Sequence, residues 1–371
     1  MKEFQKIKLN GTEYYIIDSI QNFRAEDSFI DPKNKLAQYT GHGEKRKHVG
    51  TYIGDGGKKI SDFFEYNNWG IYHKDEIKNK KTYESAKKVK AIISEKQCFF
   101  SKSNFIKYLN DTKIEYMKQE QLYHNNIGNF YQNRYKKVSN LNDEIIPFSI
   151  YDVSDNKDAK QNRGYIRSDD EIWSLWRELI LPSISYLSIL KLIPLKGKKN
   201  KPFFYFRILL DYQFRSFQHA KFFNEEEKSF MTENISTSSQ GRQGAKDYRK
   251  KVLEHMPQCP FTQITDERLL IASHIKPYAA CMNDNEIVQA IDYLNGLSLS
   301  PTYDKLFDQG YITFTDNGEL ICGTQLSVLT WEKLKINPNA KNKMRIYPEN
   351  REYYLNYHRK YIFQDNFSDL I

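Results

Sequence analysis

The sequence has no closely spaced pair of cysteines. Its four cysteines are scattered over 371 residues, at Cys98, Cys259, Cys281 and Cys322. A disulfide framework and a four-ligand zinc site usually show paired cysteines in the sequence. Their absence argues against both, so we expect no structural zinc and expect Cys259 to be a small buried apolar residue.

Long apolar runs are also missing. A bilayer-spanning helix needs ~20 mostly apolar residues, and the longest apolar-leaning segment, 180–195, is interrupted by Pro182, Lys191 and Pro194. Residues 1–8 carry charge but no apolar stretch of the kind found in signal peptides. We therefore expect a cytoplasmic protein with no membrane partner.

Basic residues are present in excess. The chain has 56 Lys and Arg against 47 Asp and Glu, which gives a formal net charge of +9. This surplus is compatible with a polyanionic partner such as nucleic acid, although many basic proteins bind nothing acidic. Aromatic residues make up 15% of the chain, and most of them are expected to lie in the core.

Composition divides the chain near residue 240. The segment 233–240 (ENISTSSQ) is the clearest linker, and we place a domain boundary there. Residues 1–240 are expected to be a mixed α/β region, either whole or as subdomains of about 1–150 and 151–240. Residues 241–371 form the second expected domain, so the predicted fold class is multidomain α+β. Within the first region, 75–137 and 184–192 are predicted to be helical and 152–163 to be a linker or surface loop.

The C-terminal region places three polar residues beside short apolar segments. His274 lies near the end of the predicted strand 269–275, and Asn295 precedes the predicted strand 297–299 after a long connection. Asp304 follows on a segment predicted to be helical. A strand, a connection, a second strand and a helix can bring these side chains to one point. Helices are predicted over 245–255, 302–308 and 349–363, and a hairpin over 311–314 and 319–321.

These residues occur as an ordered series of blocks. The central blocks are Ser273-His274-Ile275-Lys276-Pro277, Asn295-Gly296-Leu297 and Tyr303-Asp304-Lys305-Leu306-Phe307-Asp308-Gln309-Gly310. Further blocks lie upstream at 241–245, 248–249 and 259–262, and downstream at 353–359. The series resembles the HNH nuclease family with its ββα-metal fold, in the branch found in bacterial type II restriction endonucleases. A lone histidine and asparagine would be a weak signal, whereas a series over the last third of the chain is a specific one.

The resemblance implies a phosphodiester-cleaving site in which His274 is the general base on the attacking water. Asp304 stands where the family carries histidine or another metal ligand, and a carboxylate suits Mg²⁺, with Mn²⁺ as the alternative ion. Asn295 is expected to hold the loop or orient His274 through a hydrogen bond, or to ligate the metal directly. Cleavage would leave 5′-phosphate and 3′-hydroxyl ends.

One position departs from the family pattern. Many HNH nucleases carry a metal-binding carboxylate or histidine just before the base, and this chain has Ser273 there. Asp304 is then expected to bind the metal with weak or water-mediated help, or together with Asp284 or Glu286 of the connection. The structural alternatives are a satisfied strand-end histidine at His274 and a helix N-terminal acid at Asp304.

Several basic residues are candidates for contacts with DNA phosphates. They are Lys45, Arg46, Lys47, Lys198, Lys199, Arg242, Arg249 and Lys276. For the glycine-bounded loop 41–48 the alternative is a solvated hairpin tip. For Lys276 the alternatives are stabilisation of transition-state charge or a solvated position.

Together these expectations describe a metal-dependent, sequence-specific double-stranded DNA endonuclease of the restriction type, with residues 1–240 recognising the target. The expected assembly is a two-fold homodimer that matches a palindromic site, with a cognate DNA methyltransferase in the same cell. Two alternatives stay open. One is a modification-dependent or less specific defence nuclease that acts on phage DNA; the other is a non-catalytic DNA-binding protein with a degenerate HNH fold.

Overall fold

The computed structural model describes residues 4–24, 46–50, 52–53, 58–64, 97–118, 127–150, 152–156, 163–168, 170–181, 184–196, 201–210, 239–284, 286–339, 344, 346 and 349–370. The chain divides into two compact units. The N-terminal unit comprises residues 1–211 and 327–336, and the C-terminal unit comprises residues 212–326 and 337–371. Both contain helices and strands, which confirms the α+β class. The functional division near residue 240 stays a prediction.

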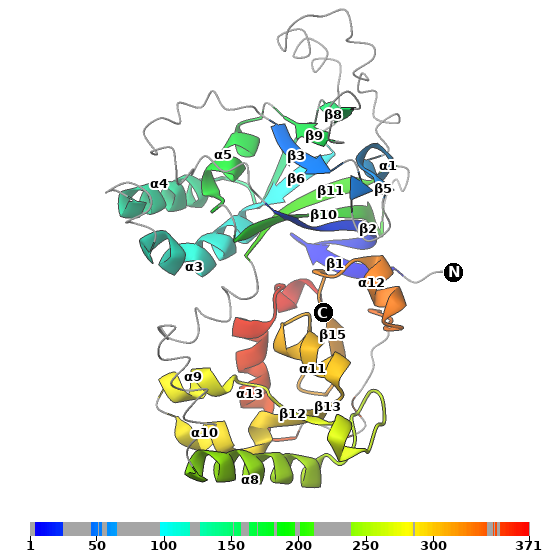
Figure 1. The fold of residues 1–371 in the computed structure, drawn as a ribbon. Helices are drawn as coiled ribbons and strands as arrows, with labels where there is room; N and C mark the ends of the chain where they lie inside the picture. The colour runs from blue at the N-terminus through cyan, green and yellow to red at the C-terminus, as the bar shows by residue number, and fades with distance from the viewer. Residues whose placement is uncertain are drawn as a thin grey trace, which may run out of the picture. The chain divides into compact units, whose positions relative to one another are not determined.

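The N-terminal unit is built on a six-stranded sheet (Figure 1). In spatial order its strands are β1 (Gln5–Leu9), β2 (Thr12–Arg24), β10 (Ser185–Pro194), β11 (Phe203–Leu210), β6 (Cys98–Ser101) and β7 (Ile145–Phe148). The β11–β6 pair is parallel and the other neighbours are antiparallel. Asn10 and Gly11 join β1 to β2 with φ angles of 45° and 78°, as the tight turn of a hairpin requires.

The segment 184–192 was predicted to be a helix, and this prediction is wrong. Most of β10 is buried, so its sequence shows a largely apolar run, interrupted by Ser188 and Lys191, instead of the alternation of a half-exposed strand. Such a run does not distinguish a buried strand from a buried helix. The strand pairs with β2 on one side and with β11 on the other.

Aromatic side chains dominate the core of this unit. Phe100 stacks on Phe148 with ring centroids 4.9 Å apart, and Trp173 lies 4.9 Å from Trp176. Phe206 contacts this cluster from β11, with its ring 5.6 Å from that of Phe100. All five side chains are fully buried, which agrees with the core role expected for most aromatic residues.

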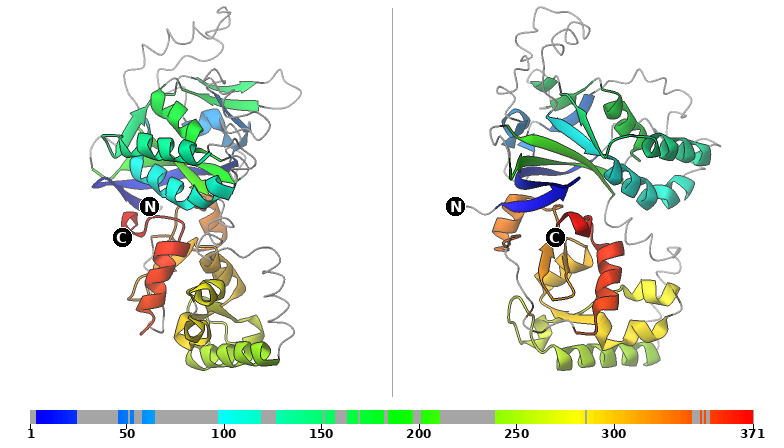
Figure 2. Two further views of the ribbon diagram at one scale, coloured as in Figure 1. Left: turned by 90° about the vertical axis from the view of Figure 1, so that its left-hand side faces the viewer. Right: turned by 180° about the vertical axis from the view of Figure 1, so that it is seen from behind.

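Among the described residues, the helices of this unit are α1 (Ile60–Phe64), α3 (Lys102–Lys118), α4 (Ile127–Ser139), α5 (Glu171–Leu179) and α12 (Val328–Lys333). Figure 2 shows α3 and α4 side by side. Smaller sheets are β3 (Arg46–Gly50), β9 (Arg163–Arg167) and β8 (Asp152–Asn156) in that order, and β4 (Tyr52–Ile53) with β5 (Lys58–Lys59).

Two further predictions for the N-terminal region need correction. The expected loop 152–163 contains β8 and the start of β9, which pair with each other. The expected helical region 75–137 does contain α3 and most of α4, but Cys98–Ser101 is a strand. Residues 75–96 and 119–126 lie outside the described residues.

The C-terminal unit contains two short strand pairs and several helices. The first pair is β12 (Ile271–His274) with β13 (Gly296–Leu299), and the second is β14 (Ile312–Phe314) with β15 (Leu320–Cys322). The α-helices are α8 (Ser239–His255), α9 (Tyr278–Asn283), α10 (Ile287–Ile291), α11 (Pro301–Asp308) and α13 (Glu352–Tyr357). Short 3-10 turns occur at Glu267–Leu269, Tyr293–Asn295 and Phe367–Asp369, and a π-helical turn at His358–Ile362.

The helix α11 begins and ends at residues suited to those positions. Pro301 occupies its first turn, where a missing N–H costs nothing. Beyond its end, Gly310 has a φ of +69°, and a Cβ there would lie 2.1 Å from the Ile362 carbonyl oxygen. Glycine therefore allows both the turn and the close approach of the π-helical segment.

The four cysteines are free and buried, as expected for Cys259. No helix among the described residues is long and apolar enough to cross a membrane.

Candidate active site

The β12–β13 pair brings His274 and the Asn295–Gly296 segment side by side. The strands are antiparallel, and His274 lies opposite Gly296. The pairing continues past the strand end, where the Ile275 amide donates to the Asn295 carbonyl at 3.0 Å. Both α8 and α11 contact this strand pair (Figure 1). The predicted order of strand, connection, strand and helix is confirmed.

The His274 ring is held on three sides. It stacks on Tyr248 of α8, with centroids 4.3 Å apart and planes 12° apart, and it meets the edge of Tyr278 at 6.0 Å. Its Nε2 lies 3.0 Å from the Ala290 carbonyl oxygen. Because a carbonyl can only accept, Nε2 carries the proton, and Nδ1 of the neutral ring keeps its lone pair.

Burial lowers the pKa of His274, and the hydrogen bond to Ala290 partly opposes this effect. A lowered pKa keeps the ring neutral near pH 7. Together with the Nε2–H tautomer, this gives a histidine whose Nδ1 can accept a proton.

Asn295 is fully buried and holds the connection between the strands. Its Oδ1 accepts the Lys276 amide at 2.7 Å, and its Nδ2 donates to the Lys276 and Gln289 carbonyls, each at 3.0 Å. Gln289 is followed by Ala290, which binds His274. Asn295 therefore holds the loop and orients His274 through the backbone of residues 289–290. Direct metal ligation stays a prediction, and it would require exposing this oxygen.

Asp304 is joined to Ser273, the residue before the histidine. The Ser273 hydroxyl donates to the Asp304 carboxylate, and this bond lowers the pKa of Asp304. Burial is the larger effect and raises that pKa, and the nearby charge of Asp308 raises it further. Burial also raises the pKa of Asp308. Asp304 and Asp308 are one turn apart on α11, so they share one face of the helix.

No hydrogen bond or ring contact joins His274 to Asp304 among the described residues; Ser273 connects them along the chain. Ser273 and His274 are consecutive residues of β12, and consecutive Cα atoms lie ~3.8 Å apart. The histidine and the Ser273–Asp304 pair therefore lie at the same end of this strand. The structure thus groups His274 with Tyr248 and Ala290, and Asp304 with Ser273 and Asp308.

Gly296 is required for space, and its φ of −135° is ordinary extended backbone. A Cβ at this position would lie 2.5 Å from Val252 Cγ2 and 2.7 Å from the Tyr248 hydroxyl. This backbone differs from that of a tight Asn-Gly turn. The missing side chain instead admits Tyr248, whose hydroxyl donates to the Asn295 carbonyl at 3.1 Å.

Lys276 differs from the sequence expectation of a DNA contact. Its side chain is only 2% exposed, and its Nζ lies 2.9 Å from Asp284 Oδ2 and 2.6 Å from Glu286 Oε2. Gln289 Oε1 accepts a third hydrogen bond at 3.2 Å. These partners correct the prediction of a phosphate contact, because the ammonium group is enclosed by internal acceptors. They also occupy Asp284 and Glu286, which the sequence offered as extra metal ligands.

The other predicted DNA contacts lie in varied settings. Arg249 donates to the Leu270 carbonyl at 2.7 Å and to the Glu267 carbonyl at 2.5 Å, so it supports the backbone before β12. Arg46 and Lys47 are in β3 and Arg242 is in α8, but their side chains are not among those described. Lys45, Lys198 and Lys199 lie outside the described residues.

Sequence reasoning missed the residues that support the site from α8 and α13. Tyr248 stacks on the histidine, and Tyr354 donates to Asp292 Oδ2 at 2.7 Å. Arg351 is buried, and its Nε donates to the Gly296 carbonyl at 3.2 Å. Their only sequence signal is that blocks containing Tyr248 and Tyr354 belong to the resembling series.

The comparison with known families decides the class of this site. The family described as HNH endonuclease matches residues 259–315, which include His274, Asn295 and Asp304. Residues 259–315 form an HNH endonuclease domain. No curated protein matches the chain.

The HNH domain offers a limited set of metal ligands. No group of three or more His, Cys, Asp or Glu among the described residues is arranged to hold a metal ion. Asp304 and Asp308 nevertheless suit Mg²⁺, which is often bound through one or two carboxylates plus substrate phosphate and keeps several waters. Burial raises the pKa of both groups, and a bound cation would favour their charged forms.

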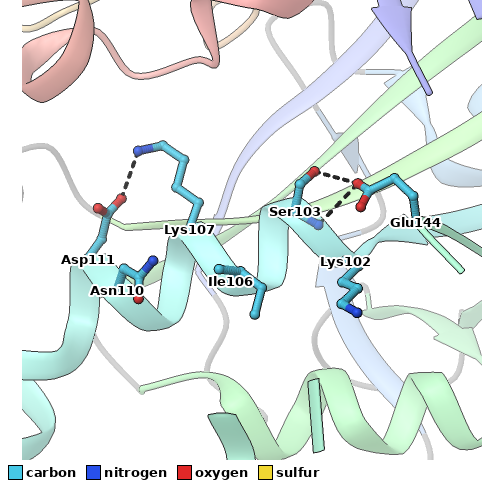
Figure 3. A pocket seen from close by; sticks show the side chains of 7 residues that line it. All are labelled: Lys102, Ser103, Ile106, Lys107, Asn110, Asp111 and Glu144. Carbon is cyan, nitrogen blue, oxygen red and sulfur yellow. Dashed lines mark hydrogen bonds and ion pairs between the residues drawn. The ribbon is translucent and has the colours of Figure 1, made fainter. Parts of the chain in front are cut away.

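A separate pocket lies beside α3 of the N-terminal unit (Figure 3). Two pairs of its polar side chains interact: Ser103 donates to Glu144 at 2.5 Å, and Lys107 lies 3.2 Å from Asp111. It contains none of the residues of the HNH site.

Proposed function

We propose that this protein is a metal-dependent, sequence-specific double-stranded DNA endonuclease of the restriction type. The observation that carries the proposal is the hydrogen bond from His274 Nε2 to the Ala290 carbonyl within an HNH endonuclease domain. That bond fixes the tautomer in which Nδ1 is the proton acceptor, as activation of a water molecule requires.

His274 is assigned as the general base. Its Nδ1 would take a proton from the attacking water, while the ring is kept in place by Tyr248 and the Ala290 carbonyl. Asn295 is assigned as the residue that holds the loop carrying that carbonyl. The lowered pKa of His274 favours the unprotonated ring, which is the form that can accept a proton from the attacking water.

Asp304 is assigned as the metal ligand, with Asp308 beside it on α11. Ser273, which replaces the usual ligand before the base, donates to Asp304 and orients its carboxylate. A bound Mg²⁺ or Mn²⁺ would supply positive charge for the phosphate and the leaving 3′ oxygen. The expected products are 5′-phosphate and 3′-hydroxyl ends.

Residues 1–240 are proposed to recognise the target sequence. The net charge of +9 supports a polyanionic partner. A homodimer is proposed because a two-fold protein matches a palindromic site and cuts both strands. A cognate methyltransferase would protect host DNA, and the protein would act in the cytoplasm as a phage defence.

The test is cleavage of methylated and unmethylated plasmid by wild type and by His274→Ala, with Mg²⁺ and then with EDTA. Wild type should give discrete fragments, and His274→Ala should lose about 10²–10⁴-fold in rate, the usual contribution of a general base. EDTA should abolish cleavage, and sequencing of the fragment ends should give one recurrent site.

The matched control is His255→Ala. His255 is an exposed histidine of the same domain that stacks on Tyr293, and its replacement should leave the rate unchanged. Cleavage only of methylated DNA would identify a modification-dependent nuclease. Binding without cleavage on every substrate, with both ions, would reject the catalytic assignment in favour of a DNA-binding protein.

A further inference from the structure

Within the connection between β12 and β13, the helix α10 has little apolar packing of its own. It spans only Ile287–Ile291, and Ala290 is the one buried residue of that helix. The larger apolar side chains face outward: Val288 is 78% exposed, Ile287 57% and Ile291 50%. Because apolar burial scales with the area removed from water, one alanine side chain anchors this helix weakly. Yet the Ala290 carbonyl must stay in place to accept the hydrogen bond from His274 Nε2–H.

Polar contacts provide the missing anchor, and they converge on one cation. The Lys276 ammonium binds Asp284 at the end of α9, Glu286 at the start of α10 and Gln289 within α10. The ring of Tyr357 lies 5.0 Å from the same nitrogen. Burial alone would lower the pKa of Lys276, but the bonds with Glu286 and Asp284 outweigh it and raise the pKa. The group is therefore charged at neutral pH.

The same residue also fixes the other side of the loop through its backbone. Its amide and its carbonyl both bind the Asn295 side chain, whose Nδ2 also reaches the Gln289 carbonyl. Gln289 is thus held at its side chain by Lys276 and at its backbone by Asn295. The next residue in the chain is Ala290.

We propose that Lys276 is a positioning residue for His274: its buried ammonium group holds α10 so that the Ala290 carbonyl fixes the Nε2–H tautomer of the histidine. This inference rests on the proposed function only in assigning His274 as the base. The histidine and Lys276 are two residues apart, yet the link between their side chains passes through the loop.

The test compares variants that lose the positive charge of Lys276 with a variant that keeps it. Lys276→Met removes the charge and keeps a similar length, whereas Lys276→Arg keeps the charge. Glu286→Gln removes one negative charge from the partners of Lys276, at a side chain that is 36% exposed, and so spares the core. Lys250→Met is the matched control, because Lys250 pairs with Glu254 on the exposed face of α8.

Two readouts separate positioning from general stability. The first is the tautomer of His274, observed by long-range ¹H–¹⁵N correlation with ¹⁵N-labelled histidine and assigned from the signal lost in His274→Ala. The second is kcat and KM on plasmid DNA. Lys276→Met should mix the tautomers and lower kcat about 10–100-fold, the range seen when supporting hydrogen bonds are removed, with KM changed less than about 3-fold. Glu286→Gln should show a smaller change of the same kind, Lys276→Arg should restore most of kcat, and Lys250→Met should match wild type.

An unchanged tautomer in Lys276→Met would overturn the proposal, as would an altered tautomer with unchanged kcat. If Lys276→Met does not fold, Glu286→Gln decides by the same criteria. If wild type cleaves no DNA, the proposed function fails, but the tautomer comparison still tests the link between Lys276 and His274.

Discussion

The aromatic cluster of the N-terminal unit and the HNH site of the C-terminal unit are held by different kinds of contact. The N-terminal unit packs phenylalanine and tryptophan rings against one another, and even its buried Lys191 has its Nζ 5.9 Å from the rings of Phe63 and Phe204. The C-terminal unit buries Asn295, Lys276 and His358 in hydrogen-bond networks. Apolar packing is non-directional, whereas hydrogen bonds fix orientation. Stability and site geometry should therefore respond differently to mutation in the two units.

A large effect on stability is expected from truncation in the aromatic core. Trp176→Ala removes a fully buried ring that lies 4.9 Å from Trp173. The cost should be about 3–5 kcal/mol, as for other buried aromatic truncations. Urea unfolding followed by circular dichroism would measure it, with the exposed Tyr353→Ala as control. If Trp176→Ala also altered the His274 tautomer while the protein is folded, the expected difference between the two units would be wrong.

Asn295→Ala tests the polar side of the comparison. It leaves the Lys276 amide and the Lys276 and Gln289 carbonyls without this partner. Each buried group left unpaired should cost about 1–3 kcal/mol of unfolding free energy. In addition, kcat of the folded protein should fall in Asn295→Ala, whereas it should not fall in Trp176→Ala. Unfolding and kcat measured on the same preparations give both numbers. If Asn295→Ala and Trp176→Ala lost the same activity at the same folded fraction, the two units would not differ in their effect on the site.

Gly296→Ala tests the geometry of the HNH site by adding a single methyl group. The new Cβ would meet Val252 and the Tyr248 hydroxyl, so Tyr248 must shift away from its stack with His274. Overpacking of this kind should cost about 1–3 kcal/mol, with loss of kcat as the main consequence. Gly11→Ala is a useful contrast, since that position has open space but a φ of +78°; it should lower stability and leave kcat unchanged.

The C-terminal unit should also show a pH dependence of stability. Burial lowers the pKa of His358 to about 3, and the ring is held neutral between Thr313 and the Phe307 carbonyl. The unfolded chain takes up the proton below its ordinary pKa of about 6.5. This contribution is therefore complete above pH 6.5 and is lost as pH falls toward 3, by up to about 1.4 kcal/mol per pH unit. His358→Gln should flatten the slope of unfolding free energy between pH 6.5 and 5; an unchanged slope would contradict the assignment.

The same contrast explains what the sequence could predict. The HNH elements β12, β13 and α11 were predicted correctly because short apolar runs, Pro301 and the motif residues occur close together. The strand β10 was missed because burial of both faces removes its alternation. The enclosure of Lys276 was missed for another reason: its partners lie 8–13 residues ahead in the chain. A lysine in the sequence does not by itself indicate whether hydrogen-bond acceptors of the protein or water will surround its side chain.

The burial of all four cysteines has a practical consequence for studying this protein. Buried thiols are poorly reactive, so the native chain should give little background in maleimide labelling. Val288 is 78% exposed on α10, next to the segment that supports His274. A fluorophore attached through Val288→Cys would then sit at one known place, and its emission could follow DNA arriving at the HNH domain in real time.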